Sequence, residues 1–244
     1  TVTHIDGDKL YAFGHGLLYL GNTELPLHKG RAMVLLPSLQ SSFKIVETMD
    51  PVGTIRQDRN SGIYGILGQK ARMIPVRVEM TTSRGAKRDL NYEVARDQLL
   101  TPLLTALTMF NTIISSERAQ GISTLRVKGK ISVKGEQPVL VENRFSSDSN
   151  APVAAALAIA IPVNFLFSSG YKNLEFEKID VAITAVEEDR TAVLDALRID
   201  RSEIKAGDTV DLEVFYRKNN GETVRDSFPV KVPHDVTPGT LVML

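Results

Sequence analysis

Short runs in which apolar and polar residues alternate recur along this chain and constrain its fold more than any other feature. Residues Ala71–Thr81 read ARMIPVRVEMT, and residues Leu174–Val186 read LEFEKIDVAITAV. Because successive side chains of a β-strand point to opposite faces of a sheet, such alternation predicts half-buried strands. Thr209–Arg217 and Thr223–Val232 alternate in the same way around an Asn-Asn-Gly turn, which predicts a hairpin. The chain is therefore expected to be mainly β.

Turns divide the first third of the chain into further strands. An Asp-Gly-Asp turn at 6–8 predicts a hairpin of Thr1–Ile5 with Lys9–Phe13, because Asp-Gly favours tight hairpin turns. A charged turn at 58–61 predicts a second hairpin of Gly53–Arg56 with Gly62–Leu67. The other predicted strands of this region are Leu25–Leu36 and Ser42–Val46. Repeated short strands of this kind are typical of a barrel or a sandwich, and we assign residues 1–82 to one β region.

The middle of the chain, residues 83–188, mixes helix and strand patterns and is expected to be α+β. Apolar residues recur at helical spacing over Glu93–Ser115, where Pro102 is expected to kink or restart the helix. The apolar run Ala151–Phe167 contains a proline and is short for a bilayer span. We interpret it as a buried helix or a helix–strand pair, with no membrane span. Strands are predicted over Ser123–Val133 and Val139–Phe145.

The last region, residues 189–244, has a separate small β pattern. Ala192–Leu197 predicts a short turn or edge element before the Asn-Asn-Gly hairpin. The closing run Val232–Leu244 resembles the last strand of an immunoglobulin-like β-sandwich. We expect this tail to serve packing or contact with a partner.

The composition argues against several classes of function. The chain has 29 Lys and Arg and 29 Asp and Glu, so no excess of charge favours nucleic acid. The basic strand face of Arg126, Lys128, Lys130 and Lys134 lacks interleaved aromatic residues, which also argues against nucleic acid. Without cysteine there is no disulfide, thiolate zinc site or cysteine nucleophile. No cofactor and no metal are expected, because His4, His28 and His234 lack metal-ligand spacing.

Two glycine-rich segments carry a family resemblance. Asp6–Leu20 reads DGDKLYAFGHGLLYL, with His15 between two glycines, and Gly53–Gly68 reads GTIRQDRNSGIYGILG. In this order they resemble the histidine segment and the second glycine-rich strand pair of the SpoIVB-type (stage IV sporulation protein B) serine peptidases. The resemblance covers about the first third of the chain. It implies a trypsin-like half-barrel, export to the periplasm, cell envelope or exterior of a bacterium, and a catalytic base at His15.

Residue chemistry agrees with a base at that position. Glycine on both sides of His15 leaves the ring open to a nucleophile, and the unperturbed pKa of imidazole lies near neutrality. The alternative interpretation is a histidine that hydrogen-bonds its own loop and has no chemical role.

The nucleophile segment of that family, of the Gly-Met-Ser-Gly-Ser-Pro type, does not occur in these 244 residues. In many relatives it precedes the histidine segment, and this chain opens without Met in a strand-like pattern. The resemblance therefore implies one of two things: the C-terminal part of a secreted, self-processing serine peptidase, in which His15 serves a serine on an upstream segment, or a relative that has lost the chemistry. Its implied partners are its own cleaved N-terminal segment and a protein or peptide substrate.

Other candidate site residues have competing interpretations. Asp58 could orient the imidazole as the third member of a triad, or cap a turn beside Arg59 with an exposed ion pair. Thr1 could act as a nucleophile with its own amine as base, or mark a cleavage boundary. The serines considered as nucleophiles within the chain are Ser38, Ser41, Ser42 and Ser61, none of which has glycine on both sides as a nucleophile elbow does.

A second function class fits the same sequence. Without its nucleophile, the chain would be a non-catalytic cell-envelope or surface-assembly protein that uses its β regions for protein–protein contacts. Long free β edges at both ends would pair with another chain, and the expected partner is then a further copy in a homo-oligomer.

Overall fold

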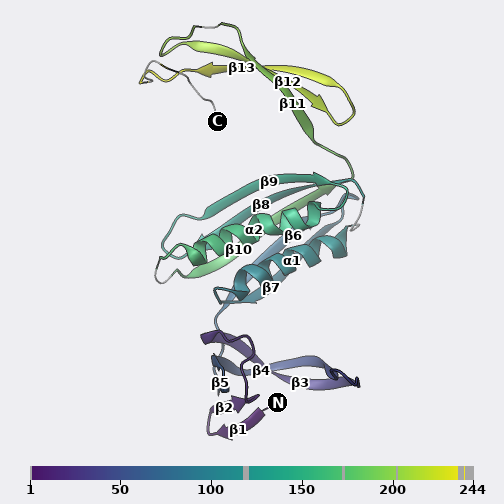
Figure 1. The fold of residues 1–244 in the computed structure, drawn as a ribbon, viewed down its shortest axis with the longest axis vertical. Coiled ribbons are helices and arrows are strands. Elements are labelled where there is room, and N and C mark those ends of the chain that lie inside the picture. The colour runs from purple at the N-terminus through teal and green to yellow at the C-terminus, as the bar shows by residue number, and fades with distance from the viewer. Residues whose placement is uncertain (1, 118–120, 172–173, 202, 236–238, 240–244) are drawn as a thin grey trace.

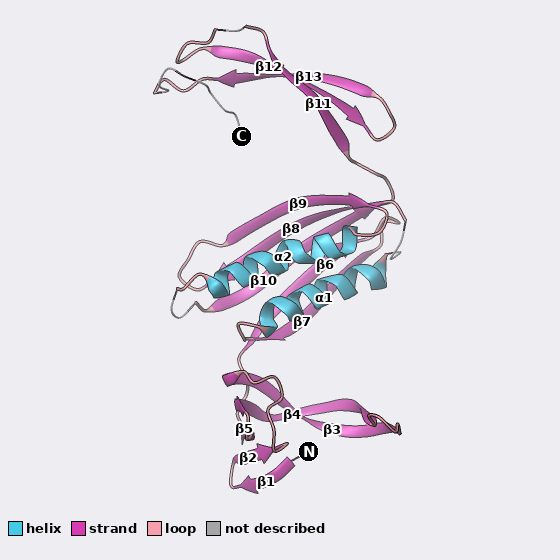
Figure 2. Cartoon of the chain, in the orientation of Figure 1, coloured by secondary structure: helices cyan, strands magenta, loops and turns pink. Residues whose placement is uncertain are grey.

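The computed structural model describes residues 2–117, 121–171, 174–201, 203–235 and 239. It is mostly β, with 54% strand and 15% helix, which confirms the expected mainly β fold with an α+β middle. Three separate sheets follow one another along the long axis of the molecule (Figure 1), and the two helices belong to the middle one (Figure 2).

The first sheet contains five antiparallel strands in the order β1-β2-β5-β4-β3. They are β1 (Val2–Asp6), β2 (Lys9–Ala12), β3 (Gly21–Leu36), β4 (Phe43–Arg59) and β5 (Gly62–Leu67). Both hairpins predicted from the turns form, β1 with β2 and β4 with β5. The sheet stays open, with β1 and β3 as its two edges, and the described residues form no closed barrel.

Half of the β3–β4 hairpin stands clear of the sheet. Strand β4 pairs with β5 only from Gly53 onward, so the preceding residues of β4 pair with β3 alone. We call the segment Lys29–Asp50 the β-arm. Every one of its residues is exposed. Figure 1 shows β3 and β4 extending together away from the rest of the first sheet.

The second sheet has the order β7-β6-β10-β8-β9. Its strands are β6 (Met73–Thr81), β7 (Lys87–Ala95), β8 (Ser123–Val133), β9 (Val139–Ser147) and β10 (Phe176–Val186). Strands β6 and β10 pair in parallel, and the other neighbours are antiparallel. The strand over 73–81, which was assigned to the first region, therefore belongs to the second sheet. The change of sheet falls at residues 68–72 and not at 82.

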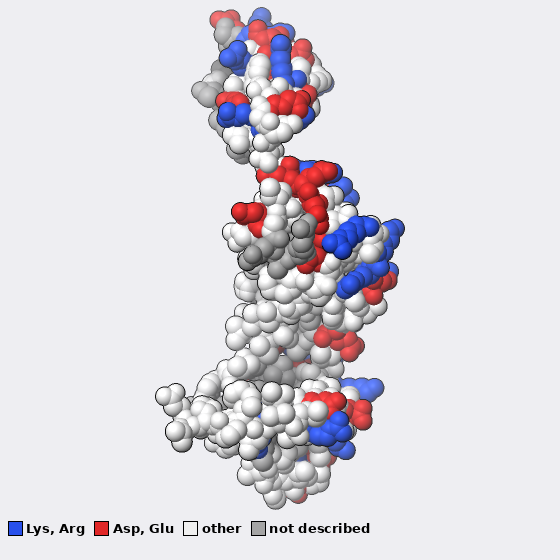
Figure 3. Space-filling model, turned by 90° about the vertical axis from the view of Figure 1, so that its right-hand side faces the viewer, with Lys and Arg blue, Asp and Glu red and all other residues white. Residues whose placement is uncertain are grey.

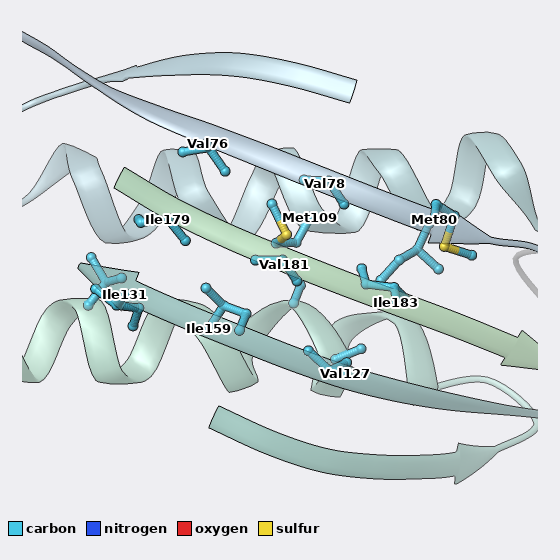
Figure 4. Close-up of a cluster of buried hydrophobic side chains, with 14 of the residues drawn as sticks. Val76, Val78, Met80, Met109, Val127, Ile131, Ile159, Ile179, Val181 and Ile183 are labelled. Carbon is cyan, nitrogen blue, oxygen red and sulfur yellow. The ribbon is translucent and has the colours of Figure 1, made fainter. Parts of the chain in front are cut away.

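Two helices cover one face of the second sheet: α1 (Leu100–Ser116) and α2 (Ala151–Ser168). The main core lies between them and the sheet, where Met109 of α1 and Ile159 of α2 meet apolar side chains of β6, β8 and β10 (Figure 4). Gly129 of β8 gives α2 room to approach, since a Cβ there would lie 2.4 Å from Ile159 Cδ1. The helices thus bind the sheet through a dry, closely packed layer.

Both helices differ in detail from their predicted form. Glu93–Ala95 continue β7, so α1 starts only at Leu100 and Pro102 lies in its first turn. A first-turn proline lacks an N–H that would have no partner in the helix anyway, so it starts the helix rather than breaking it. The run at 151–167 is one helix, with no strand part. By length and composition α2 could cross a bilayer, and its inner side packs in the core.

The third sheet is formed by β11 (Ala192–Ile199), β12 (Thr209–Lys218) and β13 (Thr223–Lys231), in that order and antiparallel. The predicted Asn-Asn-Gly hairpin forms between β12 and β13. The described residues of this tail make one sheet, whereas an immunoglobulin-like sandwich packs two. Most of the strand predicted after Val232 lies outside the described residues.

Candidate histidine site

The site candidate is the loop Phe13–Leu20, which connects β2 to β3 and carries His15. Phe13 and Tyr19 have φ values of 74° and 58°, and within the described part of the chain they are the two non-glycine residues with positive φ. A side chain in this region costs roughly 1–3 kcal/mol, and such strain persists where surrounding contacts impose it. The loop that holds the candidate base thus contains both of the described non-glycine residues in this unfavourable backbone region.

His15 has a defined ring position although its side chain is exposed. Its Nδ1 lies 2.7 Å from the carbonyl oxygen of Gly16, and its ring stacks on Phe13 at a centroid distance of 5.7 Å. A carbonyl oxygen only accepts hydrogen bonds, so Nδ1 must carry the proton. In the neutral ring Nε2 is then the unprotonated nitrogen, which is the atom that a general base uses.

The side chain of Asp58 anchors this loop through hydrogen bonds. Its side chain is 1% exposed, and its carboxylate accepts hydrogen bonds from the backbone N–H groups of Leu17 at 2.6 Å, Leu18 at 2.7 Å and Leu20 at 3.2 Å. Burial alone would raise the pKa of Asp58, but these backbone donors stabilise the carboxylate and hold its pKa below the ordinary value. Asp58 is therefore an ionised anchor for the residues that follow His15.

Neither interpretation of Asp58 made from the sequence describes these contacts. Both carboxylate oxygens bind loop amides instead of the imidazole, and the side chain is buried inside β4 instead of exposed at a turn. Arg59 donates to Gln57 and Asn22 rather than to Asp58. The backbone N–H groups of Leu17, Leu18 and Leu20 share this acceptor. The sequence signal for it was Asp58 as the single aspartate of the segment Gly53–Gly68.

Two glycines let the loop lie close to the β4–β5 hairpin. A Cβ on Gly16 would lie 2.6 Å from the ring of Tyr19 and 3.2 Å from the carbonyl oxygen of Arg59. Gly62 has a φ of 141°, and a Cβ there would lie 2.9 Å from the carbonyl oxygen of Ala12. Only glycine fits these two positions, so the two glycine-rich segments singled out in the sequence do meet in space.

A shallow hollow of about 240 Å³ opens beside the loop. Gly14 and Ser61 both line it, together with Tyr11 and Tyr64. The serines of the β-arm are placed elsewhere: the hydroxyls of Ser38 and Ser42 bond the turn at the tip of the arm. Of the serines considered from the sequence, Ser61 is the one that shares a surface with the histidine loop. Thr1 lies outside the described residues.

Ion pairs neutralise most of the predicted basic strand face. On the predicted basic strand face, Arg126 and Lys128 pair with Glu142, and Lys134 pairs with Glu175. Acidic and basic side chains are intermixed along this side of the molecule (Figure 3). Among the described residues, no three His, Asp or Glu side chains gather as metal ligands.

Compared with known protein families, with curated proteins and with solved structures, the chain matches none.

Proposed function

We propose that this chain is the histidine-bearing, C-terminal part of a secreted, self-processing serine peptidase of the SpoIVB type. In this proposal His15 is the general base, and the nucleophilic serine is on an upstream segment that is not among these residues. The observation that carries the proposal is the hydrogen bond from His15 Nδ1 to the Gly16 carbonyl oxygen, at 2.7 Å. It fixes the ring with Nε2 free and exposed, as proton abstraction from a serine requires.

The Gly16 carbonyl takes the place that a carboxylate has in a Ser-His-Asp triad. In such a triad the acceptor at Nδ1 keeps the imidazole in the reactive tautomer and orientation. A neutral carbonyl selects the same tautomer but stabilises the imidazolium less than a carboxylate does. Asp58 acts one step further away: it holds the amides of Leu17 and Leu18, and thereby the loop, so it is a positioning residue.

The uncovered apolar surface of the first region supports a missing partner segment. Its sheet buries only a small apolar cluster, to which α1 and β7 also contribute. Phe13, Leu17, Leu18 and Tyr19 of the histidine loop are all exposed, at 42–64% of their surface. A serine-bearing segment that covered this loop would bury these side chains and exclude water from the catalytic atoms.

The proposal is tested in the full-length gene product, with self-cleavage and labelling by a fluorophosphonate probe as readouts. His15→Ala should abolish both, because an unactivated serine is a poor nucleophile. Ser61→Ala is the matched control, because Ser61 lines the neighbouring hollow yet has no role in the proposal, and it should leave both readouts unchanged.

Two results would overturn the assignment. Undiminished cleavage and labelling in His15→Ala would remove the base. Loss of labelling in Ser61→Ala, with the folded state retained, would move the nucleophile into this chain and refute the separate serine segment.

A second function is favoured by one specific observation: the outer faces of α1 and α2 are apolar and uncovered. Neither helix contains a charged residue. Exposed apolar side chains recur every fourth residue along α2, and α1 adds more; they are Leu103, Leu107, Val153, Leu157, Ile161 and Phe165. The outer face of a surface helix normally carries charge, so this surface fits a non-catalytic assembly protein.

The occupant that suits this helical face is a second copy of the chain. Two identical faces without charge can meet around a two-fold axis without burying an unpaired ion. Light scattering after gel filtration tests it: the assembly function predicts a dimer or larger oligomer that Ile161→Glu dissociates. A strictly monomeric wild-type chain would refute it.

A further inference from the structure

The β-arm is apolar on both of its faces, which is unusual for a hairpin in water. The register pairs Val34 with Ile45 and Leu36 with Phe43, so these four side chains share one face. The other face carries Leu35 beside Lys44 and Ala32 beside Val46. Apart from Ala32, the apolar side chains just named are 38% to 60% exposed, and Leu39 at the tip is fully exposed. A partner that buried the apolar side chains of both faces would have to surround the β-arm.

Charge is nearly absent from the outer part of the arm. Between Ala32 and Val46 the sequence contains Lys44 as its single charged residue and no acid. The next pair along the arm, Arg31 with Glu47, is an exposed ion pair. The charged pair Arg31 and Glu47 therefore follows directly where the apolar part of the arm ends. Beyond it β3 continues over Ala32–Leu36 and β4 begins with Phe43–Val46. The four residues of β4 span roughly 13 Å, at about 3.3 Å for each residue.

The turn at the tip satisfies several of its polar groups internally. The hydroxyl of Ser38 accepts from the backbone N–H groups of Gln40 and Ser41. The hydroxyl of Ser42 accepts from the N–H of Ser38 and donates to the Ser38 carbonyl oxygen. Backbone groups without a partner are costly in a lipid phase, so internal satisfaction lowers the free energy required to leave water.

We propose that the β-arm inserts its tip into the headgroup and acyl boundary of a lipid bilayer and attaches the protein to a membrane surface. Lipid contacts both faces of the hairpin at once, which a protein partner docked on one face does not. The apolar part is long enough to reach the depth of roughly 5–10 Å typical of interfacial insertion while Arg31 and Glu47 stay among the headgroups. Lys44 reaches the same level by extending its side chain.

The outer edges of the hairpin limit the depth. Along the arm β3 and β4 pair only with each other, so half of their backbone groups have no ladder partner. Such groups are tolerated where water and headgroups reach and not in the hydrocarbon centre. The arm is thus an interfacial anchor and does not span the bilayer. This inference does not depend on the peptidase assignment.

The protein contains no tryptophan, so the fluorescence of a single introduced tryptophan reports on that position alone. Leu39→Trp places a single fluorophore at the tip. On addition of phosphatidylcholine vesicles its emission should shift to shorter wavelength, and brominated acyl chains should quench it. Anionic lipid should strengthen binding only slightly, since the tip carries one cation.

Flotation of the wild-type chain with the same vesicles gives an independent measurement. Leu36→Ser with Leu39→Ser should reduce the bound fraction at least tenfold, because burial of each leucine is worth about one power of ten or more in a partition constant. Leu140→Ser on β9 is the matched control, since Leu140 is 75% exposed but far from the arm in sequence, and it should float as the wild type does.

Three outcomes would overturn the proposal. One is a Leu39→Trp emission spectrum unaffected by vesicles. Another is equal flotation of the Leu36→Ser, Leu39→Ser variant and the wild type. The third is a dimer in lipid-free buffer that the same two substitutions dissociate, because a second copy would then occupy the arm. Unfolding curves that coincide for all variants verify that these exposed substitutions leave the fold intact.

Discussion

Replacement of Asp58 by asparagine gives the sharpest prediction about the histidine loop. The carboxylate accepts from Leu17, Leu18 and Leu20, and it is 1% exposed. Hydrogen bonds to a buried charged group are worth about 1.5–3 kcal/mol each. Asparagine has one acceptor oxygen, which in the place of Oδ2 keeps the bonds from Leu18 and Leu20, while its NH₂ group faces the Leu17 N–H and that bond is lost. The two remaining bonds are no longer charge-assisted, which weakens each by about 1 kcal/mol. We expect the Asp58→Asn variant to destabilise the loop and its sheet by about 3–5 kcal/mol at pH 7.

This difference should depend on pH in a defined direction. The pKa of Asp58 is lowered in the folded state: burial would raise it, and the backbone donors outweigh burial. A lowered folded-state pKa stabilises the fold above the unfolded value, near 3.9, and that contribution is lost as the pH falls through the folded value. The difference between the wild type and Asp58→Asn should therefore be complete above about pH 5, begin to shrink as the pH falls below about 4, and continue to shrink until the pH passes the lowered folded-state pKa.

Hydrogen exchange at the amides of Leu17 and Leu18 measures this opening free energy locally. Asp50→Asn is the control, because Asp50 is an exposed residue of the β-arm and its replacement should change stability by less than about 0.5 kcal/mol. A difference below about 1 kcal/mol between wild type and Asp58→Asn at pH 7, or one that is unchanged at pH 3, would refute the anchoring role.

The remaining predictions concern the packing of the first and second sheets. Met109→Ala removes a fully buried side chain between α1 and the second sheet and should cost about 2–5 kcal/mol in urea unfolding, whereas Leu107→Ala on the outer face of α1 should cost under about 1 kcal/mol. Equal effects of these two would contradict the placement of the core. Gly53→Ala would put a Cβ 2.4 Å from the Ile66 carbonyl oxygen and should destabilise the β4–β5 pair by roughly 1–3 kcal/mol in thermal unfolding. A neutral result there would disprove the close approach of the strands. Gly129→Val should cost a similar amount through its clash with Ile159, and an unchanged melting temperature would speak against the packing of α2 on β8.

The local sequence pattern predicted which residues form strands far better than it predicted which strands pair with each other. Alternation located the strands β8 and β9, and together with the Asn-Asn-Gly turn it located the hairpin of β12 with β13, because a hairpin joins neighbours in sequence. The strand β6 was assigned to the wrong sheet since its second neighbour, β10, follows it by about a hundred residues. Nothing in the alternation of either strand specifies such a parallel pairing.

The candidate site was predictable in part for the same reason. His15 and the glycines around it could be identified because their conformational needs are local. The contacts that position the loop were not predicted: the Gly16 carbonyl at Nδ1 is a backbone group with no sequence signature, and Asp58 reaches amides some forty residues away. The β-arm was predicted as strands. Its exposure was not predictable, because it depends on the part of β4 that does not pair with β5.

The central claim is that His15 is held with Nδ1 protonated and Nε2 free to act as a base. Long-range proton–nitrogen correlation spectra of ¹⁵N-labelled protein at pH 8.5 test it directly, because the two imidazole tautomers give different nitrogen shifts and coupling patterns. We predict that His15 gives the Nδ1–H pattern and that a variant with Phe13→Ala keeps it, since the Gly16 carbonyl is the acceptor. A His15 ring in the Nε2–H form, or one averaging between both tautomers as a free histidine does, would contradict the account.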